Sequence, residues 1–165
     1  MNNLPNLKII IDIGAKETTF PEQYPEAQCH LFEPSPEYAK KLKEKYANWD
    51  VVINEFGISD CFKEGTYPYS ISNDSFVLGG TPGPELPLKS LDKYIKDNAI
   101  EYIDLLKVDT EGMDLEILKG NPKAVGMSHY IIFEVWDNLL DFYRLLGEKF
   151  FIVDIGQRNY LCKRK

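Results

Sequence analysis

Short apolar runs alternate along this chain with segments of helical periodicity. The runs are rich in β-branched and aromatic residues and carry few interior charges, as strands buried on both faces do. Strands are therefore expected at residues 8–12, 28–33, 51–53, 103–108 and 129–135. Two further strands, at 149–154 and 159–163, flank the turn sequence GQRN and are expected to form an antiparallel hairpin at a sheet edge.

The segments between these strands predict helices. Ser35 and Pro36 are suited to the N-cap and first position of a helix, and Ser90 is suited to the N-cap of another. After the first strand, Pro21 and Pro25 limit any helix to a turn or two. Longer helices are expected at residues 36–46, from 91, at 113–120 and from 137 onward.

Residues 56–90 break this alternation. Residues 56–60 continue or leave the third strand, and residues 65–78 alternate aromatic and polar side chains around Asn73-Asp74, as in a hairpin or paired edge strands. The Gly- and Pro-rich residues 79–84 are expected to form a loop. This loop either covers a ligand or is a solvent-exposed connection without a binding role. The complete order predicts a three-layer α/β sandwich with a mostly parallel sheet and an inserted hairpin.

Composition narrows the class of protein. At 165 residues the chain is expected to form one domain, residues 1–165, and 44% apolar with 27% charged residues is a globular composition. A net charge of −7 argues against a nucleic-acid partner or an anionic membrane surface. No apolar run approaches the roughly 20 residues that span a bilayer, and the start MNNLPNLK is no secretory signal.

The three cysteines, Cys29, Cys61 and Cys162, are odd in number and lack C-x-x-C spacing. Neither a disulfide framework nor a zinc site is expected from them. A reducing, cytoplasmic setting is therefore the expectation.

Acidic residues follow several of the predicted strands. Asp12, Glu33, the pair Asp109 and Glu111, and Glu134 each lie at or just past a carboxyl end. In an open α/β sheet these ends share one edge, where ligands bind, so the acids are expected to gather there. The alternatives are a set of solvated acids and, for residues 109–112, a capped strand-to-helix turn.

The spacing of these acids indicates an adenosine ligand. Glu33 follows Asp12 by 21 residues, close to the roughly 20-residue offset at which an acid holds ribose hydroxyls in dinucleotide-type folds. No G-x-G-x-x-G run or Walker lysine is present, since the first turn has only Gly14. A ligand without a pyrophosphate is therefore favoured over a nucleotide sugar or dinucleotide.

The candidate proton acceptors are carboxylates. His30 and His129 fall early in their strands and are interpreted as structural residues. Asp109, Glu111, Glu134 or a lysine is left as the acceptor. The D-x-E spacing of Asp109 and Glu111 is weak support for a divalent cation, and no metal site is expected.

Six segments of the chain carry recognisable motifs. In chain order they read IIIDIGA at 9–15, HLFEPSPEYAKKL at 30–42, FGISD at 56–60, LKSLDKYI at 88–95, LLKVDTEGMDLEILKG at 105–120 and YIIFEV at 130–135. The most specific motifs are the F-E-P-x-P after the second strand and the K-V-D-x-E-G followed by E-x-L-K-G. Together these segments resemble the FkbM family of S-adenosylmethionine-dependent methyltransferases.

This resemblance implies a Rossmann-like class I fold with seven strands, the last antiparallel, and O-methylation of a sugar or another small hydroxylated acceptor. It implies that Asp12, Gly14 and Ala15 line the methionine end of S-adenosylmethionine. It also implies that Glu33 holds the ribose and that the residues around 57–60 face the adenine. Asp109 and Glu111 would stand beside the sulfonium, with Asp109 orienting or deprotonating the acceptor hydroxyl. The cofactor-binding residues so implied are Asp12, Gly14, Ala15, Glu33, Pro34, Gly57, Ser59 and Asp60.

The first turn departs from the family pattern D-x-G-A-N-x-G, because Lys16 replaces its asparagine and Thr18 its second glycine. Any cover for the substrate is expected from residues 65–87 or from a partner. A relative that keeps the fold and the ligand without turnover is the alternative to an enzyme.

Overall fold

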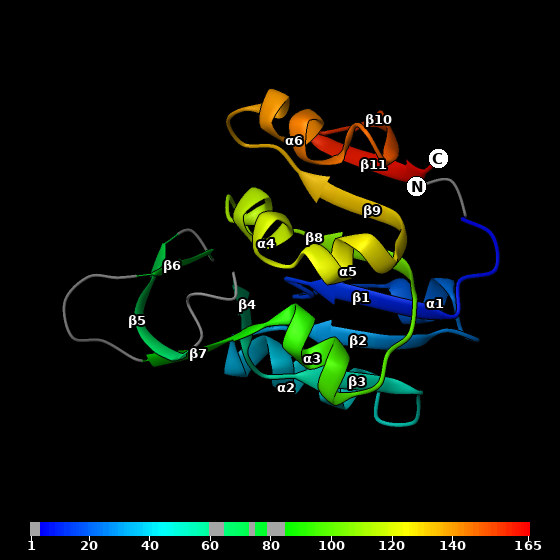
Figure 1. Cartoon of the computed structure of the whole chain (residues 1–165). Helices are drawn as coiled ribbons and strands as arrows, with labels where there is room; N and C mark the ends of the chain where they lie inside the picture. The colour runs from blue at the N-terminus through cyan, green and yellow to red at the C-terminus, as the bar shows by residue number, and fades with distance from the viewer. Residues whose placement is uncertain (1–3, 60–64, 73–74, 79–84) are drawn as a thin grey trace.

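The structure, a computed structural model, describes residues 4–59, 65–72, 75–78 and 85–165. Its main sheet has seven strands in the order β10-β11-β9-β8-β1-β2-β3 (Figure 1). All neighbouring pairs are parallel except those that β11 makes with β9 and β10. The strands are β1 (Ile9–Ile13), β2 (Gln28–Phe32), β3 (Val51–Asn54), β8 (Ile103–Val108), β9 (Ser128–Glu134), β10 (Phe150–Gly156) and β11 (Asn159–Arg164).

Helices cover both faces of this sheet, and along the central strands successive apolar side chains point to opposite faces to meet them. One core contains Ile10, Leu31 and Leu105 under α1 and α2, and the other contains Ile11, Phe32 and Leu106 under the remaining helices. The predicted three-layer sandwich is confirmed. The helices are α1 (Phe20–Gln23), α2 (Pro36–Lys45), α3 (Leu91–Asp97), α4 (Asp114–Gly120), α5 (Pro122–Met127) and α6 (Leu139–Leu146).

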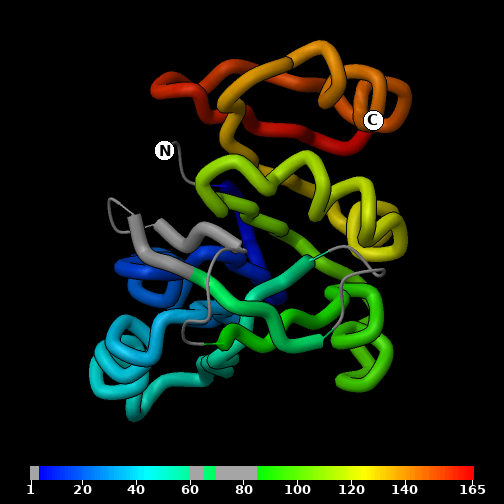
Figure 2. The backbone as a smooth tube through the Cα atoms, turned by 90° about the vertical axis from the view of Figure 1, so that its left-hand side faces the viewer, coloured from blue at the N-terminus to red at the C-terminus, as the bar shows by residue number. Residues whose placement is uncertain are grey.

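A second, smaller sheet lies beyond the carboxyl ends of the main strands, on the left in Figure 1 and toward the viewer in Figure 2. Its order is β4-β7-β5-β6, formed by β4 (Gly57–Ser59), β5 (Gly65–Ser72), β6 (Ser75–Leu78) and β7 (Glu85–Ser90). The β5–β6 pair confirms the predicted hairpin. Its expected turn at 73–74 and the expected loop at 79–84 lie outside the described residues.

Three elements differ from expectation, two of them for reasons that involve proline. Strand β7 was not predicted, because Pro87 interrupts a segment that nevertheless alternates exposed and buried side chains. Helix α5 was not predicted, because Pro122 was interpreted only as a stop after Gly120, whereas it also occupies the first turn of a new helix. The helix expected from Asp137 starts later, with Asn138 as its N-cap.

Asn121 fixes the smaller sheet to the main body. Its side-chain oxygen accepts hydrogen bonds from the backbone of Leu91 at 2.7 Å and Asp92 at 3.1 Å, which caps α3. Its side-chain nitrogen donates to the carbonyls of Ser59 at 2.9 Å and Ile117 at 2.8 Å. One buried amide therefore positions the end of β4 relative to α3 and α4.

Among the described residues, no helix is long and apolar enough to span a membrane.

Candidate active site

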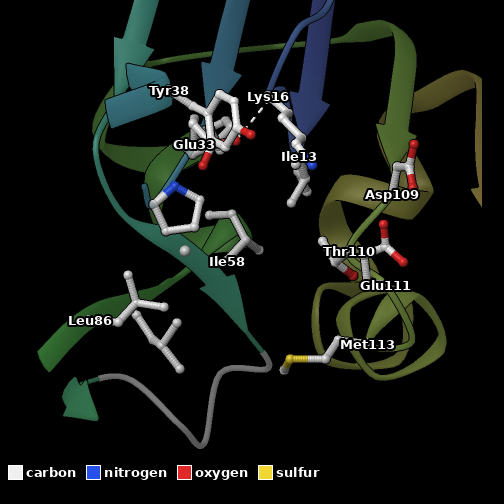
Figure 3. Close-up of a pocket in the computed structure, with 15 residues that line it drawn as sticks. Ile13, Lys16, Glu33, Tyr38, Ile58, Leu86, Asp109, Thr110, Glu111 and Met113 are labelled. Atoms are coloured by element: carbon white, nitrogen blue, oxygen red, sulfur yellow. Dashed lines mark hydrogen bonds between the residues drawn. The ribbon is translucent and has the colours of Figure 1, made fainter. Parts of the chain in front are cut away.

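A cleft lies where β1, β2 and β8 end, and β4 and β7 close its far side (Figure 3). Glu33 and Tyr38 lie on one side of the cleft, and Asp109 and Glu111 lie on the other with Ile13 between them. The cleft therefore combines carboxylates at two margins with an apolar wall. That wall consists of Ile13, Phe32, Ile58, Leu86, Leu88 and Met113.

Gly14 forms the tight turn after β1. The backbone N–H groups of Gly14 and Ala15 donate to the Phe32 carbonyl at 3.0 Å and 3.1 Å, and Asp109 donates its N–H to the Ile13 carbonyl at 3.0 Å. Gly14 has φ +80°, and a Cβ there would lie 2.0 Å from the Asp109 carbonyl oxygen. Only glycine fits between the ends of β2 and β8, as a left-handed turn with close backbone approach requires.

Glu33 follows β2 and is 4% exposed, although it lines the cleft. One carboxylate oxygen accepts the Lys16 N–H and the other accepts the Ser35 N–H, both at 2.8 Å. Burial raises the pKa of Glu33, while these two hydrogen bonds act in the opposite direction. Each oxygen has a second lone pair, so Glu33 can brace the first turn and still accept from a ligand hydroxyl.

Lys107 occupies the centre of the site between two carboxylates. Its ammonium lies 3.2 Å from Asp12 Oδ1 and 3.1 Å from Asp109 Oδ2. Asp12 is fully buried, lies opposite Lys107 in the β1–β8 pairing and does not line the cleft. Its other carboxylate oxygen has no hydrogen-bond partner among the described residues. Asp12 thus serves Lys107 as a buried counter-ion.

The charge on Lys107 is stable. Burial lowers the pKa of Lys107, but the carboxylates of Asp12 and Asp109 outweigh burial, and the net change is upward. An ammonium that two carboxylates hold in its charged form has no lone pair with which to accept a proton, so the arrangement favours Asp109 over Lys107 as the base. Sequence reasoning gave Lys107 no role in the site.

A second cavity adjoins the cleft on the other side of Gly14. Ala15, Thr18, Gln23 and Lys107 line it, and Gly14, Lys16 and Asp109 line both cavities. An elongated ligand could therefore extend from the Glu33 side past Gly14 and Asp109 to the first turn.

Asp114 organises the corner that carries Asp109 and Glu111. One oxygen accepts from the Thr110 hydroxyl at 2.6 Å and the Thr110 N–H at 3.0 Å, and the other accepts the Glu134 N–H at 2.9 Å. Burial raises the pKa of Asp114 to about 6 despite these hydrogen bonds. The bonds hold Glu111 in a left-handed conformation, φ +54°, with its side chain exposed. The sequence alone had not indicated a role for Asp114 in the site.

The remaining predicted site residues fall in three places. Pro34 and Gly57 line the cleft, and a Cβ at Gly57 would come within 2.7 Å of a Leu88 methyl group. Ser59 is buried in β4 and does not line the cleft, although its carbonyl holds Asn121. Asp60 lies outside the described residues.

Glu134 does not join the other acids. Its carboxylate accepts from the Trp136 indole N–H at 2.7 Å and pairs with Arg158 at 2.9 Å. The expected single row of acids is thus divided between the Lys107 site and a separate cluster. Within the described part of the chain, no three His, Cys, Asp or Glu side chains are grouped closely enough to hold a metal ion.

His30 is buried within β2, and its Nδ1 lies 2.8 Å from the Tyr94 hydroxyl. Burial lowers the pKa of His30, which favours the neutral ring. His129 is exposed near the start of β9 and lines neither cavity. Both positions agree with structural roles.

The sequence model of the FkbM methyltransferase domain matches residues 12–148. The chain belongs to the FkbM methyltransferase family. Curated relatives include methyltransferase sdnD of Sordaria araneosa, at 27% identity over 82% of this chain and 69% of sdnD. The 2-O-methyltransferase NoeI of Sinorhizobium fredii is 24% identical over 80% of this chain and 65% of NoeI. The hexuronic acid methyltransferase AglP of Haloferax volcanii is 26% identical over 81% of this chain and 58% of AglP.

Solved structures agree on the fold of this FkbM protein. The ribosomal protein L11 methylase of Lactobacillus delbrueckii superposes with a TM-score of 0.53 at 15% identity, covering 98% of this chain and 72% of the methylase. The precorrin-6y C5,15-methyltransferase of Geobacter metallireducens superposes with a TM-score of 0.54 at 12% identity, covering 98% of this chain and 82% of that methyltransferase. The FkbM protein is therefore a methyltransferase by family and has a Rossmann-like methyltransferase fold.

Proposed function

We propose that this FkbM protein transfers a methyl group from S-adenosylmethionine to a hydroxyl oxygen of a small sugar acceptor. The observation that carries the proposal is the meeting of the two cavities at Gly14, with Glu33 on one side and Asp109 on the other. We further propose that residues 1–165 form a single methyltransferase domain.

The residues at the site fit this cofactor. Ile58, Leu86 and Leu88 offer an apolar wall suited to an adenine ring. Glu33 has free lone pairs for ribose hydroxyls, and the second cavity, beside Ala15, suits a methionyl group. Bare backbone at Gly14 would let the ligand pass between these parts.

S-Adenosylmethionine supplies a methyl group on a positively charged sulfur. During transfer the acceptor oxygen forms a bond to that carbon, the carbon–sulfur bond breaks, and the hydroxyl proton must leave. Asp109 would orient the hydroxyl and take its proton, since its carboxylate borders both cavities and its side chain is 37% exposed. Lys107 would keep that carboxylate in place, and Glu111 would add negative charge at the margin.

The acceptor class is supported by the relatives. NoeI is a 2-O-methyltransferase and AglP acts on a hexuronic acid, and sugar hydroxyls suit a carboxylate acceptor of the Asp109 type. The net charge of −7 favours such a small acceptor over a nucleic acid.

The test is transfer of labelled methyl from S-adenosylmethionine to a panel of mono- and disaccharides. Asp109→Asn is expected to lower kcat by about 100-fold or more with less effect on cofactor affinity, because proton removal contributes mainly to the chemical step. Asp97→Asn, whose side chain is 56% exposed in α3, is the matched control and is expected to keep wild-type activity. Equal losses of kcat and cofactor affinity in Asp109→Asn would make Asp109 a binding residue.

A module that binds the cofactor without turnover is the alternative. Two observations favour this alternative. Thr18 stands where the family pattern has a glycine, and the Glu33 carboxylate already accepts hydrogen bonds from two backbone N–H groups. Binding of S-adenosylhomocysteine with no labelled product from any sugar would support this alternative.

A further inference from the structure

A second cluster lies beside the candidate active site at the same edge of the sheet. Val108 of β8 pairs with Phe133 of β9, and Asp109 and Glu134 are the residues that follow them. Adjacent strands lie about 4.8 Å apart, so the segment after Glu134 starts one strand from Asp109. Trp136 is two residues further along and 45% exposed.

The Trp136 ring is held firmly although it is exposed. Its N–H donates to Glu134 at 2.7 Å, and the Arg158 guanidinium carbon lies 3.8 Å from the ring centroid. Arg158 also pairs with the second Glu134 oxygen at 2.9 Å. Both Glu134 oxygens are therefore used as tethers, and the indole is fixed by its N–H and by one face.

The hairpin turn that carries Arg158 suggests that this side chain is present for its contacts. Gln157 and Arg158 have φ values of +53° and +62°, and such turns favour asparagine and glycine. The Arg158 carbonyl accepts the Val135 N–H at 2.9 Å, which locks the turn against the strand end. Turn chemistry alone would not select arginine at this position.

We propose that Trp136, Arg158 and Glu134 form an acceptor subsite that takes a pyranose ring. A pyranose has an apolar C–H face that packs on an indole, and hydroxyls at its rim that accept from a guanidinium. The Arg158 guanidinium pairs with Glu134 through one of its nitrogens, and no side-chain hydrogen bond to another described residue occupies its remaining N–H groups. The subsite rests on the proposed function, because it would present the sugar to the neighbouring Asp109 corner.

Trp49 provides a matched control within the chain. It is 41% exposed and packs edge-on against Tyr46, with ring centroids 6.0 Å apart. It precedes β3, at the opposite edge of the sheet from Asp109, and lines neither cavity. A response common to any exposed tryptophan should therefore appear equally at Trp49 and Trp136.

The binding test uses fluorescence of the Trp49→Phe variant, in which Trp136 is the one tryptophan left, since the chain has two. Methyl β-glucopyranoside and methyl β-glucuronide are the probes, and sorbitol is the acyclic control. A saturable change with at least one pyranoside in the millimolar range, absent with sorbitol, is expected. Arg158→Gln in the same background should weaken the response, and Trp136→Phe, which leaves Trp49, should show none.

The kinetic test uses the acceptor found by methyl transfer. Trp136→Ala is expected to raise the acceptor KM about tenfold, as loss of an aromatic anchor does, with unchanged affinity for S-adenosylhomocysteine. Trp49→Ala should change neither quantity. Far-ultraviolet circular dichroism of both variants checks that each is folded.

Failure of this inference and failure of the proposed function give different results. Tight S-adenosylhomocysteine binding with no pyranoside response, or an unchanged acceptor KM in Trp136→Ala, overturns the subsite and leaves the methyltransferase proposal standing. A pyranoside response at Trp136 without binding of either cofactor form supports the subsite and contradicts the proposed function.

Discussion

Replacing Lys107 by methionine tests the charge arrangement at the centre of the site. Methionine replaces the lysine stem with an unbranched side chain that is one atom shorter, and it removes the ammonium between Asp12 and Asp109. Asp12 is fully buried, so its carboxylate would lose its counter-ion without gaining water. Breaking such a buried pair costs roughly 3–5 kcal/mol, a large part of the roughly 5–15 kcal/mol by which native proteins are stable.

Urea denaturation followed by circular dichroism measures this loss as a lower midpoint with an unchanged slope. Adding Asp12→Asn to Lys107→Met removes the stranded charge, so the double variant is expected to be more stable than Lys107→Met alone. Lys41→Met is the control, because its ion pair with Glu37 is on the surface, with side chains 56% and 74% exposed, and its midpoint should not change.

Two results would refute this reasoning. A loss below about 1 kcal/mol in Lys107→Met would mean that Asp12 is solvated or protonated in the folded protein. A double variant no more stable than Lys107→Met would show that the cost comes from packing of the lysine stem.

Three further predictions concern the cleft and its corner. Glu33→Ala is expected to weaken S-adenosylhomocysteine binding about tenfold or more by calorimetry, because the ribose acceptor is lost and two backbone N–H groups lose their partner; unchanged affinity would exclude the ribose role. Gly14→Ala should abolish that binding and lower the urea midpoint, because its Cβ would lie 2.0 Å from the Asp109 carbonyl oxygen; a wild-type midpoint would contradict the close approach. The pKa of Asp114, raised by burial from 3.8 to about 6, means that the folded state holds this proton more tightly than the unfolded state. Its contribution to stability is therefore present below about pH 4 and lost as pH rises through about 6, by roughly 3 kcal/mol. Asp114→Asn should show a correspondingly weaker fall in urea stability over that range, and parallel pH profiles would contradict the shift.

Much of the fold follows from local patterns in the sequence. The apolar runs at β1, β2, β8 and β9 are buried on both faces, which is why they lack alternation and were recognisable as strands. Ser35 and Ser90 cap α2 and α3 as expected, because each serine side chain accepts a backbone N–H only three residues further along the chain. Strand β7 was not predicted, because Pro87 obscures its local pattern and its conformation depends on pairing with β4 and β5.

The site was predictable in part, and the missing part is long-range. The acids at strand ends were visible, but Lys107 meets Asp12 only through a β1–β8 register that joins residues 95 positions apart. No local signal showed that Asp12 would be buried as the counter-ion of Lys107. Nor did one show that Glu134 would form an ion pair with Arg158, on the later β10–β11 hairpin, and so lie apart from the other acids. Gly14 was found because small residues directly after a buried strand are a local signal, although the close approach to the Asp109 carbonyl that requires glycine there is long-range.

The central claim is that the cleft between Glu33 and Asp109 binds S-adenosylmethionine. Titration calorimetry of the full chain with S-adenosylmethionine and S-adenosylhomocysteine tests it most directly. We expect S-adenosylmethionine and S-adenosylhomocysteine each to bind at a stoichiometry near one per chain. Absence of heat with either compound at millimolar concentration would contradict the claim.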